Sequence, residues 1–203
     1  KDRIAERKGK AGTDFISRIL STPLDDIIDH DDYILPNLIL MFAAAHETIV
    51  NLIGNGMYAL LKNPDQLALL KEKPELIESA IEEMLRYDSP QQLAWRSALD
   101  NVTVGGHEFK KGEQLMLLLG SANFDPTHFP DPYKFDITRR PNRHLTFGKG
   151  RHICMGSWMA RMEAKIAIPA LLKQFPNMEL DDSKTEWLTN LSFRGLKTAT
   201  LNV

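Results

Sequence analysis

The stretch Phe147-Gly148-Lys149-Gly150-Arg151-His152-Ile153-Cys154-Met155-Gly156 decides the fold, and it contains the only cysteine of the chain. Glycines close to a cysteine let backbone amides approach the sulfur, because no Cβ blocks unusual φ values. A helical pattern follows at once, and the positive end of a helix favours thiolate over thiol. A single thiolate does not suit an iron–sulfur cluster or a structural zinc, which need several ligands. It suits the one proximal ligand of a haem iron.

The spacing Phe-Gly-x-Gly-x-His-x-Cys-x-Gly resembles the haem-thiolate signature of the cytochrome P-450 monooxygenases, in the form common among bacterial members. The resemblance implies haem b as the cofactor and Cys154 as its axial ligand to iron. It also implies that Phe147, Gly148 and Gly156 lie around the haem and that His152 hydrogen-bonds a haem propionate. The alternatives are an inert, buried cysteine in a glycine-rich turn and a histidine satisfied by backbone groups.

The composition is ordinary for a globular protein. Of the 203 residues, 43% are hydrophobic and 26% are charged, and the net charge of −2 gives no electrostatic basis for binding nucleic acid. A single cysteine excludes an internal disulfide, which favours a cytoplasmic location. The longest apolar run, residues 38–45, is shorter than the ~20 residues that span a bilayer, so we expect no membrane association.

The resemblance covers about the C-terminal half of the family's length. The chain begins at Lys1, without a methionine, inside a charged helical pattern. We expect residues 1–203 to form a single partial domain, the haem-binding portion of a cytochrome P-450. The expected fold is mainly α with small β-sheets (α+β), and it contains a long central helix and a cysteine loop that leads into a helix.

Apolar periodicity and helix-ending residues predict helices over residues 13–21, 31–62, 64–72, 74–87 and 155–174. Thr13 or Asp14 is the expected cap of the first helix. The long second helix is apolar nearly all round, so we expect it to be buried. The expected core residues of the last helix are Trp158, Met162, Ile166 and Leu171. From Leu93 onward the pattern changes to that of short strands and hairpins.

Polar side chains interrupt the long apolar helix in the segment Ala44-Ala45-His46-Glu47-Thr48. Such groups are costly to bury without partners. The matching family segment crosses the haem face where oxygen binds, and its acid and threonine organise the water that delivers protons. By resemblance, Ala44 and Ala45 lie against the haem, and Glu47 and Thr48 are catalytic. Ala45 departs from the family's usual glycine. The alternative is a Thr48 that bonds a preceding carbonyl and a Glu47 that reaches solvent.

Glu83 and Arg86 are three positions apart, so they share a helix face and can form an ion pair. Many solvated helices contain Glu-x-x-Arg, but here it lies between the two motifs above. That order matches the internal ion pair that braces the family's haem-binding loop. In the family a third residue completes the pair. Because Lys134 stands where the family usually has arginine, we expect His144 in this role, with Arg139 as the alternative.

Arg96 stands at the start of the strand-rich region, where the resemblance implies an ion pair with a haem propionate. The alternative is a surface arginine. Residues 191–195 are expected to form a turn that projects into a substrate pocket. Lys149, Arg151 and Arg143 are either a basic docking patch for an electron donor or solvated loop charges.

These features predict a haem-thiolate monooxygenase that inserts one atom of dioxygen into a small apolar organic substrate, by hydroxylation or epoxidation. A separate ferredoxin- or flavodoxin-type protein with its reductase would supply electrons, since the chain has no flavin or nicotinamide fingerprint. A peroxide-driven haem peroxygenase is one alternative, which the retained Glu47-Thr48 pair disfavours. The other is a non-catalytic fragment without haem, and we expect the half-length chain alone to be inactive.

Overall fold

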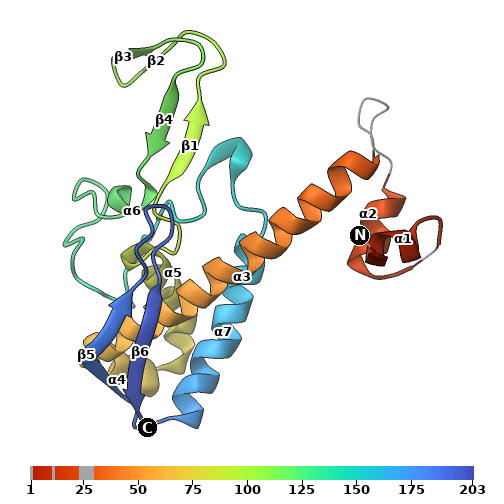
Figure 1. The fold of residues 1–203 in the computed structure, drawn as a ribbon. Helices are drawn as coiled ribbons and strands as arrows, with labels where there is room; N and C mark the ends of the chain where they lie inside the picture. Colours follow the sequence, from red (N-terminus) through yellow and green to blue (C-terminus); the bar gives the residue numbers. More distant parts are fainter. Residues whose placement is uncertain (1, 11, 23–29) are drawn as a thin grey trace. The chain divides into compact units, whose positions relative to one another are not determined.

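The computed structural model describes the backbone of residues 2–10, 12–22 and 30–203 (Figure 1). The chain divides into two compact units, residues 1–47 and 48–203, and the boundary falls within helix α3 (His30–Lys62). The elements described below are helices and two-stranded antiparallel sheets, which confirms the mainly α fold with small β-sheets. The expectation of a single domain over 1–203 stays a prediction.

The first unit contains α1 (Asp2–Arg7), α2 (Phe15–Ser21) and the first turns of α3. Of the two predicted caps, Thr13 and Asp14, it is Asp14 that caps α2, because its carboxylate accepts hydrogen bonds from the backbone amides of Ile16 at 3.1 Å and Ser17 at 3.2 Å. The Ser17 hydroxyl and the Arg7 guanidinium also donate to this carboxylate, and together these bonds lower the pKa of Asp14 to about 2.

Helix α3 confirms the predicted long helix, but its burial differs from the prediction. Leu52 and Leu60 in its second half are buried, whereas Leu40 and Phe42 in its first half are exposed, Phe42 to 77%. The expectation of a helix buried along its whole length is therefore wrong. An apolar face is buried only where other elements cover it, and among the described residues the earlier turns bury Ile34 but leave Leu40 and Phe42 exposed.

By length and composition alone, α3 is also a candidate membrane span over Tyr33–Lys62. Its second half is nevertheless built like a helix of a protein core. Asn55 is fully buried there, and its amide donates to the backbone carbonyls of Asp88 at 3.2 Å and Arg194 at 3.0 Å. The expectation of no membrane association stays a prediction.

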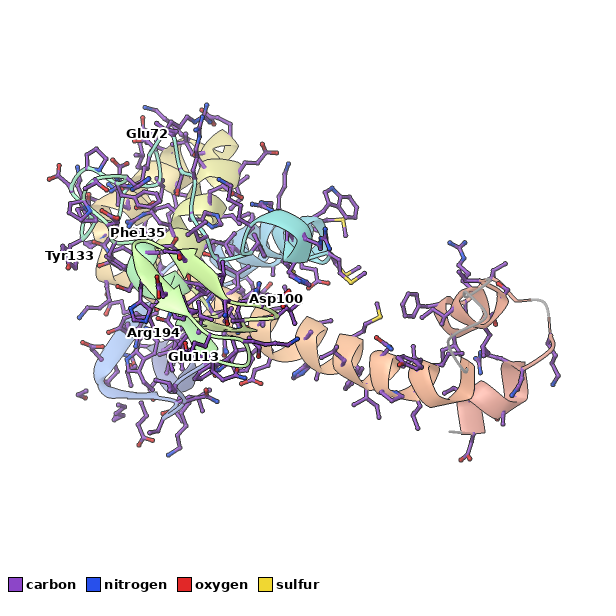
Figure 2. All side chains as sticks on the ribbon, turned by 90° about the horizontal axis from the view of Figure 1, so that it is seen from above. Glu72, Asp100, Glu113, Tyr133, Phe135 and Arg194 are labelled. Carbon is purple, nitrogen blue, oxygen red and sulfur yellow. The ribbon has the colours of Figure 1, made fainter. Side chains whose placement is uncertain are left out.

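Three further helices build the core of the second unit: α4 (Pro64–Glu72), α5 (Ile77–Tyr87), which a short 3-10 turn (Pro74–Leu76) precedes, and α7 (Ser157–Gln174). Their positions confirm the predicted helices. Phe135, labelled in Figure 2, is one of the buried residues of this core. The fully buried members of the core include Leu60, Ala80, Ala164, Ile137 and Ile168.

The face of α7 that enters the core is not the predicted one. Ala160, Ala164 and Ile168 are buried, whereas Trp158 is 71% exposed and Ile166 is 66% exposed. Met162 is exposed as well, and of the predicted core residues only Leu171 packs against the core. The two alanines lie one turn apart, and their small side chains allow α7 to approach α5 closely. Apolar residues on several faces made the core face ambiguous in the sequence.

The strand region consists of hairpins, as predicted. Strand β1 (Ala94–Ser97) pairs with β4 (Gln114–Leu117), and β2 (Val102–Val104) pairs with β3 (His107–Phe109) at the tip of the same ribbon (Figure 1). Gly105 and Gly106 form the connecting turn with φ values of 58° and 82°, which glycine adopts readily. The third sheet pairs β5 (Glu179–Trp187) with β6 (Leu196–Asn202) near the C-terminus.

After β4 the chain forms the short helix α6 (Leu119–Ala122) and then a long irregular segment, residues 123–149. A 3-10 turn (Gly150–His152) follows, and the chain enters α7 directly after Cys154-Met155-Gly156. The irregular segment has few backbone hydrogen bonds of its own, so side chains from α5 must hold it in place.

Candidate functional site

The cysteine loop, residues 147–156, is a tight turn closed by its own backbone. Gly148 and Gly150 have φ values of 69° and 78°, which side chains with a Cβ rarely adopt. The amide of Cys154 donates to the carbonyl of Phe147 at 2.9 Å, and the amide of Gly148 donates to the carbonyl of Leu145 at 2.7 Å. These hydrogen bonds bring the beginning and the end of the loop together, and they fix the backbone of Cys154 near the end of the loop.

The thiol of Cys154 lies open to a ligand rather than buried in the turn. The residue is exposed, and the first turn of α7 begins at Ser157, whose amide donates to the Cys154 carbonyl at 3.3 Å. A Cβ built on Gly156 would lie 3.8 Å from Sγ, so the glycine leaves the flank of the sulfur uncovered. Ile153 and Met155 beside it are exposed apolar side chains. The cysteine is therefore not buried in its turn, as the alternative required, and its role as an iron ligand stays a prediction.

This donor set fits a haem better than a metal ion bound by protein alone. One accessible sulfur with apolar side chains beside it can supply a single axial ligand to a flat, apolar cofactor. Among the residues that the structure describes, no group of three or more His, Cys, Asp or Glu side chains could hold a metal ion. A structural zinc or an iron–sulfur cluster would need such a group.

The predicted ion pair of Glu83 and Arg86 is present at the centre of the second unit. Both side chains have no exposed surface, and the contact is bidentate, with Nε–Oε2 at 2.8 Å and Nη2–Oε1 at 2.9 Å. The remaining Arg86 hydrogen bonds go to backbone carbonyls of the irregular segment. These are the carbonyls of Asn123 at 2.9 Å, Pro132 at 2.8 Å and Lys134 at 3.2 Å. One buried cation thus fixes three points of a segment that lacks regular structure.

The third partner of this pair is Arg139, and the preferred prediction of His144 is wrong. Arg139 Nε lies 3.2 Å from the Glu83 carboxylate, and the Asn142 amide donates to the same carboxylate at 3.0 Å. His144 bonds instead to Glu82, the neighbour of Glu83 on α5, at 3.1 Å. Successive residues of a helix point to different faces, so His144 reaches a carboxylate on another side of α5.

Phe124 is part of an aromatic cluster around Arg86. Its ring centroid lies 5.4 Å from the Arg86 guanidinium carbon and 5.3 Å from the ring centroid of Tyr133. Tyr87 and Phe129 also present their rings to this guanidinium, at 5.7 Å and 5.5 Å. The rings shield the buried cation from water and contribute favourable cation–π contacts.

A buried polar network that the sequence analysis missed holds the residues just before the cysteine loop. Thr146 donates its hydroxyl to the carbonyl of Leu85 on α5 at 2.6 Å, and it contacts the Ser89 hydroxyl at 2.8 Å. Asn123 donates to both hydroxyls and accepts from the amide of Leu145 at 2.7 Å. Single Ser, Thr and Asn residues carry no sequence signal for such a network, because it forms only when distant segments meet.

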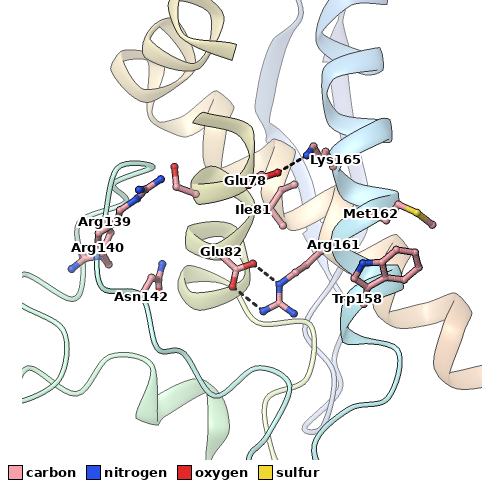
Figure 3. A pocket seen from close by; sticks show the side chains of 11 residues that line it. Glu78, Ile81, Glu82, Arg139, Arg140, Asn142, Trp158, Arg161, Met162 and Lys165 are labelled. Carbon is pink, nitrogen blue, oxygen red and sulfur yellow. Dashed lines mark hydrogen bonds and ion pairs between the residues drawn. The ribbon is translucent and has the colours of Figure 1, made fainter. Parts of the chain in front are cut away.

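Glu82 and Arg161, also missed in the sequence, link α5 to α7 beside the cysteine loop (Figure 3). Arg161 donates to Glu82 from Nε at 2.5 Å and from Nη2 at 2.8 Å. Burial alone would raise the pKa of Glu82, but the hydrogen bonds from Arg161 and His144 outweigh it and lower that pKa to about 2. Glu82 and Arg161 line a pocket of about 580 Å³. Trp158, Arg139 and other side chains of α5, α7 and residues 139–142 form the rest of its lining.

The two predicted propionate ligands are exposed and lie on different elements. Arg96 is on β1, and its guanidinium donates to the carbonyl of its neighbour Trp95 at 2.7 Å. His152 ends the 3-10 turn of the cysteine loop. Both side chains are accessible to a ligand, and their roles stay predictions.

The predicted oxygen-side residues all lie on α3. Ala44, Ala45 and Glu47 belong to the first unit and are exposed, and Thr48 is the first residue of the second unit. The helix is continuous through this segment, and Ala45 stands in it without a break. The catalytic roles of Glu47 and Thr48 stay predictions.

Comparison with known proteins agrees with this geometry. The family model described as Cytochrome P450 matches residues 71–198. The biotin biosynthesis cytochrome P450 of Bacillus subtilis is 44% identical over 197 residues, which are 97% of this chain and 50% of that protein. The monooxygenase PikC of Streptomyces venezuelae is 41% identical over 96% of this chain and 48% of its own length.

Solved structures give the same result. P450BioI, in complex with an acyl carrier protein that carries hexadec-9Z-enoic acid, superposes with a TM-score of 0.91 and 42% identity. That match covers 98% of this chain and 51% of the other. CYP109E1 from Bacillus megaterium in complex with testosterone superposes with a TM-score of 0.89 and 37% identity, over 98% of this chain and 56% of that one. The chain spans about half the length of the curated relatives it matches.

Proposed function

Because the chain belongs to the cytochrome P450 family, we propose that the whole protein is a haem-thiolate monooxygenase with Cys154 as the axial ligand of haem b. The observation that carries the proposal is the position of Cys154. It is the only cysteine, it is exposed, and it stands in a loop held by its own backbone and by α5. The same loop matches the signature of the family residue by residue.

The reaction inserts one oxygen atom of dioxygen into an apolar C–H or C=C bond and reduces the other atom to water with two electrons and two protons. Haem, when bound, supplies the activation of dioxygen and the transfer of the oxygen atom. Within this chain, Cys154 would hold the cofactor, and Gly148 and Gly150 supply the positive φ values that the tight turn before the cysteine requires. Arg96 and His152 are proposed to bind the propionates.

Glu47 and Thr48 are proposed to manage the protons of the reaction. An acid and an alcohol that follow each other on an apolar helix can hold a short chain of water molecules that reaches solvent. The exposed side chain of Glu47 supports this role, since it can exchange protons with bulk water. Replacement by Glu47→Gln or Thr48→Val should leave haem binding intact and increase the reducing equivalents consumed per product formed.

Electrons are proposed to come from a ferredoxin- or flavodoxin-type protein that is reduced by its own reductase. Lys149 and Arg151 lie in the cysteine loop and Arg143 lies shortly before it, and all three are exposed. Positive charge beside the cofactor steers an acidic partner and accelerates its association at low salt. Charge reversal at Lys149 and Arg151 should lower the association rate and its dependence on salt, whereas reversal at the exposed Lys173, at the far end of α7, should change neither.

The substrate is proposed to be a mainly apolar organic molecule. The two solved relatives were captured with a long-chain fatty acyl group on a carrier protein and with a steroid, and both ligands are large and apolar. Residues 191–195, which the isolated bridge between Gln91 and Phe193 holds, are proposed to project toward this substrate. We place the protein in the cytoplasm, and we expect the 203 residues alone to be inactive.

Turnover under labelled dioxygen tests the proposal. The whole protein, supplied with a ferredoxin, its reductase and a long-chain fatty acid, should transfer one labelled atom into the product and the other into water. Product that takes its oxygen from peroxide, at a rate unaffected by removal of the redox partners, would favour the peroxygenase instead. Absence of haem from the purified whole protein would favour a non-catalytic role.

A further inference from the structure

Glu82 joins three separate elements around the cysteine loop. It lies on α5 and accepts the bidentate contact of Arg161, from the second turn of α7, at 2.5 Å and 2.8 Å. It also contacts His144, from the segment just before the loop, at 3.1 Å. His144 therefore precedes the loop and Arg161 follows it, and a single carboxylate ties both to the same helix.

The hydrogen bonds of His144 leave it one orientation. Its Nδ1 accepts from the amide of Thr146 at 3.3 Å, so Nε2 carries the proton and donates to Glu82. The side chain is only 3% exposed. Both ring nitrogens of His144 are hydrogen-bonded, and the side chain has almost no access to water. His144 therefore holds the backbone just before the cysteine loop in place.

Arg161 extends this contact to Phe147, the first residue of the cysteine loop. Its guanidinium carbon lies 4.6 Å from the centroid of the Phe147 ring, and its Nη1 donates to the carbonyl of Ser157 at 3.2 Å. The Phe147 carbonyl in turn accepts the amide of Cys154 at 2.9 Å. Glu82 is therefore connected to the cysteine through three successive contacts: its ion pair with Arg161, the cation–π contact of Arg161 with the Phe147 ring, and the backbone hydrogen bond between Phe147 and Cys154.

We propose that Glu82, with Arg161 and His144, forms a clamp that positions the cysteine loop and so sets the place of the Cys154 sulfur. This inference rests on the proposed function, because the position of the sulfur affects activity only if Cys154 is the haem ligand. The clamp is distinct from the buried pair of Glu83 and Arg86, whose described contacts reach residues 123–142 of the irregular segment and none of residues 147–156. Glu82, Arg161 and His144 are positioning residues, since none of them is placed on the haem or the substrate.

The same helices offer a matched control. Glu78 lies one turn before Glu82 on α5, and it forms an ion pair with Lys165, which lies one turn after Arg161 on α7 (Figure 3). Both pairs link α5 to α7 and both line the same pocket. The pair of Glu78 and Lys165 has no contact with the cysteine loop among the described residues. Glu78→Gln therefore removes a link between the helices without touching the loop.

Amide hydrogen exchange on the full chain tests the clamp without haem. Glu82→Gln places an amide against Arg161 and His144 and removes a charge-assisted contact. Exchange at the Cys154 amide should become about ten-fold faster, the effect of losing one such bond. Glu78→Gln should change it less than about two-fold. Arg161→Lys keeps the charge but loses the second hydrogen bond, and its rate should lie between those of wild type and Arg161→Gln.

The whole protein with haem supplies a second readout. In the reduced carbon monoxide complex, Glu82→Gln should move part of the Soret band from the thiolate position to the blue, and Glu78→Gln should leave the band unchanged. Equal exchange rates at Cys154 in Glu82→Gln and Glu78→Gln, or faster exchange across the whole chain in both, would overturn the clamp. If the wild type binds no haem, the proposed function fails, and the exchange rates still decide about the clamp.

Discussion

Arg86 and Glu83 form a bidentate ion pair in which neither side chain has exposed surface, with nitrogen–oxygen distances of 2.8 Å and 2.9 Å. Every remaining donor of the guanidinium that the structure describes is directed at carbonyls of residues 123–134. Both members of the pair lie on α5, but their main structural role is to hold the irregular segment in place.

Removal of one partner should unfold the second unit or bring it close to unfolding. Glu83→Ala leaves Arg86 buried without a counter-charge, and such a change typically costs ~3–5 kcal/mol. Chemical denaturation should show this loss, together with poor retention of haem by the whole protein. Glu78→Ala, which breaks an exposed pair on the same helix, is the control and should denature at the wild-type midpoint. A wild-type midpoint for Glu83→Ala would show that the pair does not hold the segment.

Two glycines of α3 should respond to alanine in opposite directions. A Cβ on Gly54 would meet only Leu196 Cδ1 at 3.8 Å, an ordinary contact, so Gly54→Ala should stabilise the helix by up to ~1 kcal/mol. A Cβ on Gly56 would lie 2.7 Å from the sulfur of Met84, which is buried in a close-packed core. Gly56→Ala should therefore lower the thermal midpoint while Gly54→Ala raises it. The same direction of change in both variants would contradict this packing of α3 on α5.

Glu82 should contribute to stability in a defined range of pH. Its pKa is about 2 in the folded chain against an ordinary value of 4.5, so the folded state favours the ionised form. A carboxyl group with a lowered pKa stabilises the fold above its unfolded pKa, and this stabilisation is lost as pH falls from about 4.5 toward about 2. The unfolding free energy of Glu82→Gln should decline less steeply over that range than that of wild type. If the unfolding free energies of wild type and Glu82→Gln decline equally over this range, the contacts with Arg161 and His144 do not lower the pKa of Glu82.

The sequence predicted those parts of the fold that depend on local pattern. The helices that begin at residues 64 and 74, and a cap at Thr13 or Asp14, follow from the backbone preferences of single residues. The cysteine loop was recognised because its glycines and cysteine lie within ten positions of each other. The ion pair of Glu83 and Arg86 was found for the same reason, since its members share a helix face.

Contacts between distant segments could not be predicted in this way. Arg139 and His144 were both plausible partners for Glu83, and only the path of the chain between them decides which one reaches it. The sequence predicts the wrong core face for α7, because the large apolar residues Trp158 and Ile166 give a stronger signal than Ala160 and Ala164, which the structure buries. Small residues that permit close packing give a weaker signal than large ones that fill space.

The reduced carbon monoxide spectrum tests the central claim most directly, that Cys154 ligates haem as a thiolate. It should be recorded on the whole protein and on the chain of 203 residues, each with Cys154→Ala as the control. The whole protein should show the red-shifted Soret band of a thiolate ligand, and Cys154→Ala should lose it. A band of that kind that persists in Cys154→Ala, or its absence from the whole protein, would contradict the account.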